Sequence, residues 1–419
     1  MQNAIIVLGF LLTYIGMAAG RLPWLRVDRT GIALLGVIWL LGFQAATIDD
    51  IAGNIDTATL VLLFALMIVS AQFAASGFFE ICIDWMMRVA GGPTALLAIT
   101  VAVCGGLSAL LANDILLFGL TPLLIAGVRQ RGLDPRPFVL ALAAATNAGS
   151  AATLIGNPHN ILIGQMANLS FWSFLGACAV PAMVSLVAVF IVIWLQWRGR
   201  METVETLPPD LPELPIHHHD RNETVKGIVA FLAMLAFFAT SLPRENGALV
   251  IAAVLLLSRK YTSRTMIGAV DWPLLLLVAC LFGVTGVLAN TGITEAIIDT
   301  LQQHDLMPDN LLVMTPLTLL MSNTLGNTPW VILLMEVWRA PPTGPLYGLA
   351  LLSSLAGNLL LVGSLANVIV VERAAFYGVR ITFAEHARAG VPITLLSMAF
   401  AMFWLAYFGW LPVFPGSGG

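Results

Sequence analysis

Long apolar segments, separated by short polar ones, fill most of this 419-residue chain. A membrane-spanning helix needs about 20 apolar residues, and most of these segments are close to that length. The pattern predicts ten spans, at 4–20, 31–46, 58–76, 137–164, 172–196, 226–241, 246–258, 271–290, 345–371 and 390–411. We therefore expect an all-α polytopic membrane protein.

Two of these spans are longer than one crossing requires. The span 137–164 is interrupted at Gly156-Asn157-Pro158, and the span 345–371 at Gly363-Ser364, so each is predicted to unwind midway. Two further apolar stretches, 94–128 and 308–336, carry a polar cluster at the middle. Because each of their arms has only about 15 apolar residues, re-entrant hairpins are favoured over pairs of ordinary crossings.

The chain also repeats itself at a constant spacing of 215 residues (271 − 56 for the first pair). Asp56, Gly77, Glu80 and Asp84 recur in this register as Asp271, Gly292, Glu295 and Asp299. Each half then holds five spans, a re-entrant hairpin and a broken helix, and an odd number of spans inverts the second half. We expect one inverted repeat at 1–200, a proline-rich cytoplasmic linker at 201–224 and the second repeat at 225–412.

Composition excludes several classes of protein. Hydrophobic residues make up 59% of the chain and charged residues 10%, whereas roughly a quarter of a soluble domain is charged. The four cysteines lack CxxC spacing, which argues against a disulfide framework and a metal site. No nucleophile elbow, phosphate loop, cofactor motif or nucleic-acid patch is present, so the sequence predicts neither an enzyme nor a cofactor.

The basic residues predict how the chain is oriented. With both termini outside, 17 of the 19 Lys and Arg residues fall on the cytoplasmic side, including Arg21, Arg26 and Arg29, and only Arg244 and Arg339 fall outside. The positive-inside rule favours this arrangement in the inner (plasma) membrane.

Polar residues gather at the two hairpin tips and the two helix breaks, where backbone groups must be satisfied by protein, water or a ligand. The candidate substrate- or ion-binding residues are Ser108, Asn113 and Asp114 at the first tip, Thr153, Asn157, His159 and Asn160 at the first break, Ser322, Asn327 and Thr328 at the second tip, and Ser364 and Asn367 at the second break. Half-helix N-termini suit an anion or a neutral oxyacid, while unwound carbonyls equally suit a cation. For any single Asn, ligand contact and helix capping are equally open, but the duplication favours one shared site.

Asp114 is the only carboxylate that the pattern places deep in the membrane, and His159 is the only deep histidine. An ionisable group there is costly and is by default a functional candidate. We expect Asp114 to load and release a proton during transport. The alternative for both residues is a structural role, held by neighbouring hydrogen bonds.

Three motifs link the chain to known families: the run from Thr153 to Gly164, Ser108 with Ala112-Asn113-Asp114, and Val270-Asp271-Trp272-Pro273. With them the chain resembles the ion transporter superfamily, which includes arsenite permeases, silicon efflux transporters and sodium-coupled dicarboxylate carriers. The resemblance covers nearly the whole chain and implies a secondary transporter. The two hairpin tips look most like those of the arsenite permease branch.

The resemblance also bears on the coupling ion. Sodium-coupled carriers of this superfamily have Ser-Asn-Thr at both tips, whereas this chain has Ala112-Asn113-Asp114 and Gly326-Asn327-Thr328. A lost hydroxyl at each tip and a gained carboxylate favour a proton over sodium.

The arsenite branch implies efflux of arsenite or antimonite, neutral as the trihydroxide, against inward proton flow by alternating access. The alternatives are a sodium-coupled importer of dicarboxylates or another anion, and a channel. A cluster of buried Arg or Lys would favour a dianion, and the pattern predicts none in the core. A homodimer and an associated ATPase subunit are both compatible with the sequence.

Overall fold

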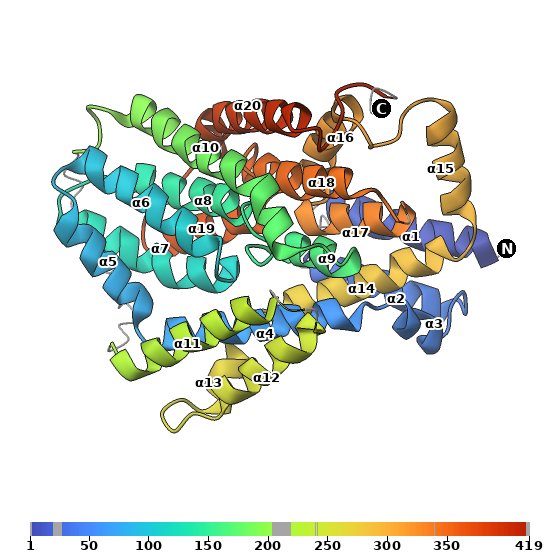
Figure 1. Ribbon diagram of the computed structural model, residues 1–419, viewed down its shortest axis with the longest axis horizontal. Coiled ribbons are helices and arrows are strands. Elements are labelled where there is room, and N and C mark those ends of the chain that lie inside the picture. Colours follow the sequence, from blue (N-terminus) through green and yellow to red (C-terminus); the bar gives the residue numbers. More distant parts are fainter. Residues whose placement is uncertain are drawn as a thin grey trace.

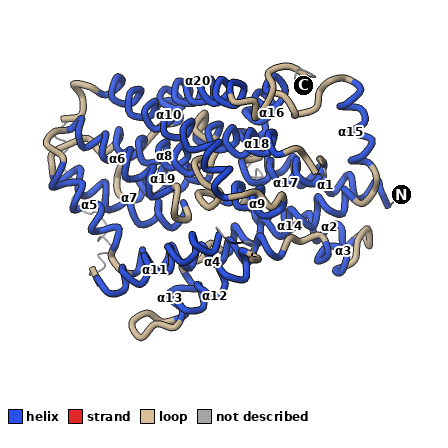
Figure 2. The backbone as a smooth tube through the Cα atoms, in the orientation of Figure 1, coloured by secondary structure: helices blue, strands red, loops and turns tan. Residues whose placement is uncertain are grey.

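The computed structural model describes residues 2–19, 27–202, 219–238, 240, 242–338 and 340–415. Most of the predicted linker, together with Arg21, Arg26 and Arg339, lies outside these residues. Within them the secondary structure is helical throughout (Figures 1 and 2). The elements are α1 (Gln2–Ala19), α2 (Arg29–Gly42), α3 (Ile48–Gly53), α4 (Thr57–Ala75), α5 (Phe78–Val89), α6 (Pro93–Ser108), α7 (Asn113–Gln130), α8 (Arg136–Ser150), α9 (Pro158–Met166), α10 (Phe171–Trp197), α11 (Arg221–Phe238), α12 (Arg244–Leu256), α13 (Ser263–Gly268), α14 (Trp272–Ala289), α15 (Ile293–Gln303), α16 (Leu311–Thr324), α17 (Asn327–Val337), α18 (Thr343–Ala356), the 3-10 turn η1 (Leu361–Gly363), α19 (Leu365–Phe376) and α20 (Phe383–Tyr407).

Several of these helices are suited to a membrane. Among the described residues, α1, α4, α10, α14 and α20 are long and apolar enough to cross it, and α2, α6 and α16 are shorter apolar helices. The all-α polytopic fold predicted from the apolar segments is confirmed.

The two repeats share their local structure as well as their sequence. Asp56 and Asp271 cap α4 and α14, each accepting a hydrogen bond from the backbone N–H three residues on (3.1 and 3.0 Å). Gly77 and Gly292 precede α5 and α15 with φ of 73° and 79°, a left-handed conformation that glycine adopts without steric cost. In Figure 1, α5 and α15 lie at opposite ends of the long axis, as inversion requires.

Helices of one repeat pack against helices of the other, in equivalent pairs. The helix α2 packs against α14, and its counterpart α12 packs against α4. Likewise α19 packs against α7, and α9 packs against α17. The repeats are therefore interlocked, and each half-helix lies against the hairpin of the other repeat.

Both predicted hairpins and both predicted breaks are present. The residues 109–112 join α6 to α7, and Leu325-Gly326 joins α16 to α17. Both breaks are longer than predicted, because α8 already ends at Ser150 and α9 begins only at Pro158, while α18 ends at Ala356 and α19 begins at Leu365. The first unwound turn persists because the side chain of Asn160 binds the carbonyls of Ser150 and Thr153.

The last span was predicted wrongly at 390–411, because it begins at Phe383 and ends at Tyr407. Thr382 and Glu385 form a capping box that starts the helix in a polar first turn. An apolar criterion does not register such a turn.

Candidate functional site

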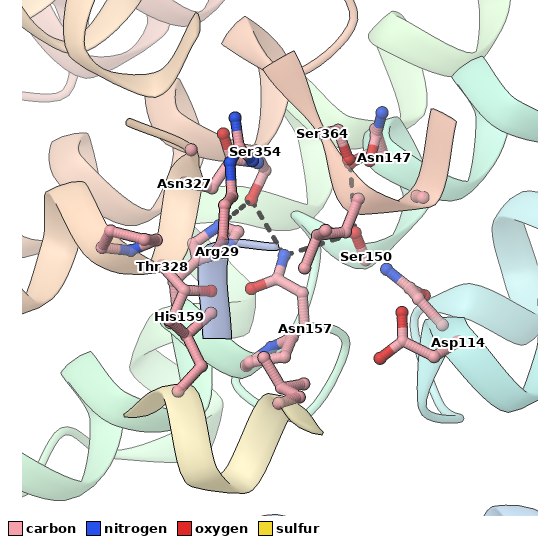
Figure 3. A pocket seen from close by; sticks show the side chains of 18 residues that line it. Arg29, Asp114, Asn147, Ser150, Asn157, His159, Asn327, Thr328, Ser354 and Ser364 are labelled. Carbon is pink, nitrogen blue, oxygen red and sulfur yellow. Dashed lines mark hydrogen bonds between the residues drawn. The ribbon is translucent and has the colours of Figure 1, made fainter. Parts of the chain in front are cut away.

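Four helix N-termini meet at one cavity of about 60 Å³ (Figure 3). Two of them, at α7 and α17, follow the hairpin tips, and two, at α9 and α19, follow the helix breaks. Each such end carries partial positive charge and unpaired N–H groups. The cavity is therefore suited to the oxygen atoms of an anion or an oxyacid.

Seven of the predicted site residues line this cavity, so the structure brings all four predicted places together. They are Asn113, Asp114, Asn157, His159, Asn327, Thr328 and Ser364. Asp114 is 8% exposed and His159 3%, so both ionisable side chains are withdrawn from bulk solvent.

The other five predicted residues do not line the cavity. Ser108 donates to the carbonyl of Gly105 (2.9 Å), and Thr153 donates to the carbonyl of Ala109. Ser322 is buried, and its hydroxyl has no hydrogen-bond partner within the described residues. Asn160 and Asn367 are also buried behind the cavity wall.

Asn160 and Asn367 hold the unwound turns in the same way. Asn160 donates to the carbonyls of Ser150 (3.2 Å) and Thr153 (2.9 Å), which lie ten and seven residues earlier. Asn367 donates to the carbonyls ten and seven residues before it, at Gly357 (2.7 Å) and Leu360 (3.2 Å). Both side chains therefore bind backbone carbonyls of their own break, as the capping alternative expects.

Hydrogen bonds between the two repeats hold the cavity wall together. The amide of Asn157 donates to Ser354 Oγ (2.9 Å), which also lies 2.9 Å from His159 Nε2. On the other side, Ser364 Oγ donates to Asn147 Oδ1 (2.9 Å). Dashed lines in Figure 3 mark such bonds between the labelled side chains.

The sequence pattern places Arg29 in a cytoplasmic segment ahead of the span and predicts no cluster of Arg or Lys in the core, but the side chain of Arg29 lines the cavity. Arg29 begins α2 and lines the cavity, with Nη2 3.5 Å from the carbonyl oxygen of Val362. The span was predicted to start only at residue 31, but Asp28 accepts a hydrogen bond from the N–H of Gly31 and caps the helix earlier. The cavity is therefore lined by one guanidinium as well as by the carboxyl of Asp114.

Three polar lining residues were also missed: Asn147, Ser150 and Ser354. Each lies in the last turn of a helix that precedes a break. Polar residues in an otherwise apolar helix, within one turn of a predicted break, are the signal that could have found them.

Two of the residues that line the cavity carry a buried side-chain oxygen without a hydrogen-bond partner among the described residues. They are Asn113 and Asn327, at equivalent positions in the two repeats, and the atom is Oδ1 in each. A buried carbonyl oxygen without a donor is costly, so each is available to a ligand hydroxyl or a cation. No cluster of three or more His, Cys, Asp or Glu side chains is found in the described part of the chain.

Comparison with known proteins agrees with this architecture. A family described as citrate transporter matches residues 14–344, which is most of the chain. The chain belongs to this citrate transporter family. Its membership confirms the predicted relationship to the ion transporter superfamily, and the family is one of transporters rather than enzymes.

Two relatives of this citrate transporter family member extend over almost its full length. The 46 kDa membrane protein of Mycobacterium leprae is 28% identical over 97% of this chain and 99% of its own. The silicon efflux transporter of Oryza sativa subsp. japonica is 27% identical over 90% of this chain and 92% of its own. The citrate transporter family member is therefore a multi-pass secondary transporter of the anion or oxyacid type.

A solved structure shares the fold of this citrate transporter family member. The YdaH transporter of Alcanivorax borkumensis, reported to have an unusual topology, aligns with a TM-score of 0.55. The alignment covers 99% of this chain and 100% of that one at 15% identity. At this identity the likeness speaks for the fold alone.

Proposed function

We propose that the protein exports arsenite, antimonite or a similar small inorganic oxyacid in exchange for protons, by alternating access. The observation that carries the proposal is the cavity of about 60 Å³ lined by amides, hydroxyls and four helix N-termini. Amides, hydroxyls and helix N-termini form hydrogen bonds with the oxygen atoms of such a solute.

Asp114 gives a route to proton coupling. Exchange requires that the substrate and the proton are not carried together in the same direction. An ionised Asp114 accepts hydrogen bonds from the hydroxyls of a neutral trihydroxide, whereas a protonated Asp114 needs no counter-charge or substrate to cross. Competition between proton and substrate for one carboxyl in one cavity is therefore enough to couple them.

The proposal includes the arrangement of the chain in the membrane. It divides the chain into a first repeat at 1–200, a cytoplasmic linker at 201–224 and a second repeat at 225–412, with both termini outside the plasma membrane. The equivalent caps at Asp56 and Asp271 and the opposed positions of α5 and α15 support this division (Figure 1).

A second candidate is sodium-coupled import of a carboxylate. It is favoured by Arg29, which supplies a positive charge in the cavity, and by the unpartnered oxygens of Asn113 and Asn327, which are suitable sodium ligands. The loss of the hydroxyl beside each of these asparagines, and the carboxyl of Asp114, favour the proton.

A flux assay separates the two candidates. Purified protein in liposomes is tested for arsenite, silicate, phosphate and succinate transport under imposed proton or sodium gradients. We expect arsenite flux that follows the proton gradient and is unchanged when sodium is removed. Succinate flux that requires sodium would overturn the proposal in favour of the second candidate.

A further inference from the structure

We propose that Arg29 and Arg244 are equivalent residues that alternate at the substrate cavity. Arg29 lines the cavity in the conformation described here, and Arg244 lines it when the cavity faces the other side of the membrane. This inference rests on the proposed alternating access. It assigns a site role to Arg244, which lies outside the cavity in this conformation.

The equivalence follows from position. Arg29 is the first residue of α2 and Arg244 the first of α12, and they are 215 residues apart (244 − 29). The next short helices, α3 and α13, are capped by Thr47 and Thr262, again 215 apart (262 − 47). The packing agrees with this equivalence, because α2 packs against α14 and its counterpart α12 packs against α4, the counterpart of α14.

The contacts of the two arginines differ. Arg29 reaches the cavity and the break between α18 and α19, where its one described hydrogen bond, to the carbonyl of Val362, is long at 3.5 Å. Arg244 lies at the far end of α9, where it donates to the carbonyls of Gly164 (3.3 Å) and Leu169 (2.6 Å). Arg244 is therefore held firmly on protein carbonyls, while Arg29 is positioned to bind a ligand.

Comparing the two broken helices shows how far the positions of the two arginines differ. Asn160 and Asn367, with identical capping patterns, are 207 residues apart (367 − 160), so the counterpart of Val362 is Ile155. Arg244 binds Gly164, nine residues beyond Ile155 (164 − 155). Most of these nine residues belong to α9, where each residue rises about 1.5 Å along the helix axis. The two arginines therefore contact the equivalent broken helices at positions that differ by roughly 13 Å.

Inverted repeats exchange conformations when a transporter changes the face to which it opens. The opposite state then places Arg244 beside Ile155 and the cavity, and places Arg29 beside Val371, the counterpart of Gly164. A guanidinium donates charge-assisted hydrogen bonds to oxygen atoms. Substrate entering from either face would thus meet one arginine, and the two faces would select for the same oxygen-rich solute.

Cross-linking tests the geometry without requiring transport. In a background with the four native cysteines replaced by alanine, the pairs R29C with V362C and R244C with I155C are treated with a short bifunctional thiol reagent, between pH 5.5 and 8.5 and with or without phosphate. We expect both pairs to cross-link, the first in the conformation described here and the second in its exchanged counterpart. A 29–362 cross-link without any 155–244 cross-link under these conditions would overturn the alternation, and so would failure of the 29–362 pair.

Kinetics in liposomes of uniform orientation test the role in binding. R29Q is expected to raise KM about 10-fold or more for substrate entering from one face, and R244Q for substrate entering from the other, because a charge-assisted hydrogen bond is lost. R29K and R244K should recover part of the loss, and R264Q, at an exposed position on α13, should change nothing. Equal effects of R29Q and R244Q on both faces would contradict the alternation. If both cross-links form but no oxyacid is moved, the proposed function fails and the alternation stands.

Discussion

The side-chain amide of Asn157, in the first repeat, donates a 2.9 Å hydrogen bond to Ser354, in the second. The reciprocal bond joins Ser364 to Asn147, and both positions shift by the same 207 residues (354 − 147 and 364 − 157). Each break is therefore tied to the helix before the opposite break. The cavity wall is complete only when both repeats are in place, which couples its shape to their relative position.

Removing Ser354 should disrupt this wall. S354A leaves the amide of Asn157 and the ring of His159 without this shared partner, and an unsatisfied buried polar group costs about 1–3 kcal/mol. We expect substrate flux to fall about 10-fold or more. The matched control is S353A, because the neighbouring hydroxyl is also buried but has no hydrogen-bond partner in the described part of the chain. Equal losses in the two variants would show that the bond to Asn157 does not matter.

Asp114 should be needed for coupling rather than for folding. D114N keeps the size of the side chain but cannot exchange a proton, so we expect proton-driven flux to disappear while the thermal unfolding temperature in detergent stays near that of the wild type. D84N, at an exposed position on α5, serves as the control with an equal change of charge. Full retention of gradient-dependent flux in D114N would remove Asp114 from the mechanism.

The close approach of α8 to α6 should tolerate no side chain. A Cβ at Gly149, on α8, would clash with the backbone carbonyl of Gly105, on α6. G149A is therefore expected to lower the free energy of unfolding by about 1–3 kcal/mol, as overpacking does. G106A, one residue along α6 and with open space around it, should be neutral or stabilising by up to about 1 kcal/mol. Unfolding of the two variants in detergent makes the comparison.

The outline of the fold could be predicted because it follows from the pattern of apolar residues along the chain. Hairpins and breaks show themselves as polar clusters inside apolar text, and the 215-residue spacing shows the repeat. Arg29 could not be found in this way. Its place depends on how α2 packs against α14 and reaches the opposite repeat, a long-range relationship that no local pattern contains.

The different roles of the asparagines could not be predicted from the sequence either. Asn157 lines the cavity, whereas Asn160, one turn later, turns back to two carbonyls. Local spacing allows both roles for either residue, since an Asn side chain caps a helix as readily as it binds a ligand. Only the path of the unwound backbone decides between them.

The two capping asparagines should be equally important for stability. N160A and N367A each leave two backbone carbonyls without a side-chain donor, and we expect each to cost about 1–3 kcal/mol. N160D and N367D should be no better, because a carboxylate has no N–H to offer these carbonyls. Thermal unfolding of the four variants is the measurement. A loss in only one repeat would contradict the equivalence of the two breaks.

The central claim is exchange of a neutral oxyacid for protons, and internal pH tests it most directly. Liposomes holding the protein and a pH-sensitive dye are loaded with arsenite and diluted into arsenite-free buffer without sodium. The account predicts that arsenite leaves, that the lumen becomes acidic as protons enter, and that D114N abolishes the acidification. Arsenite efflux with no change of internal pH, or efflux that occurs only when sodium is present, would contradict it.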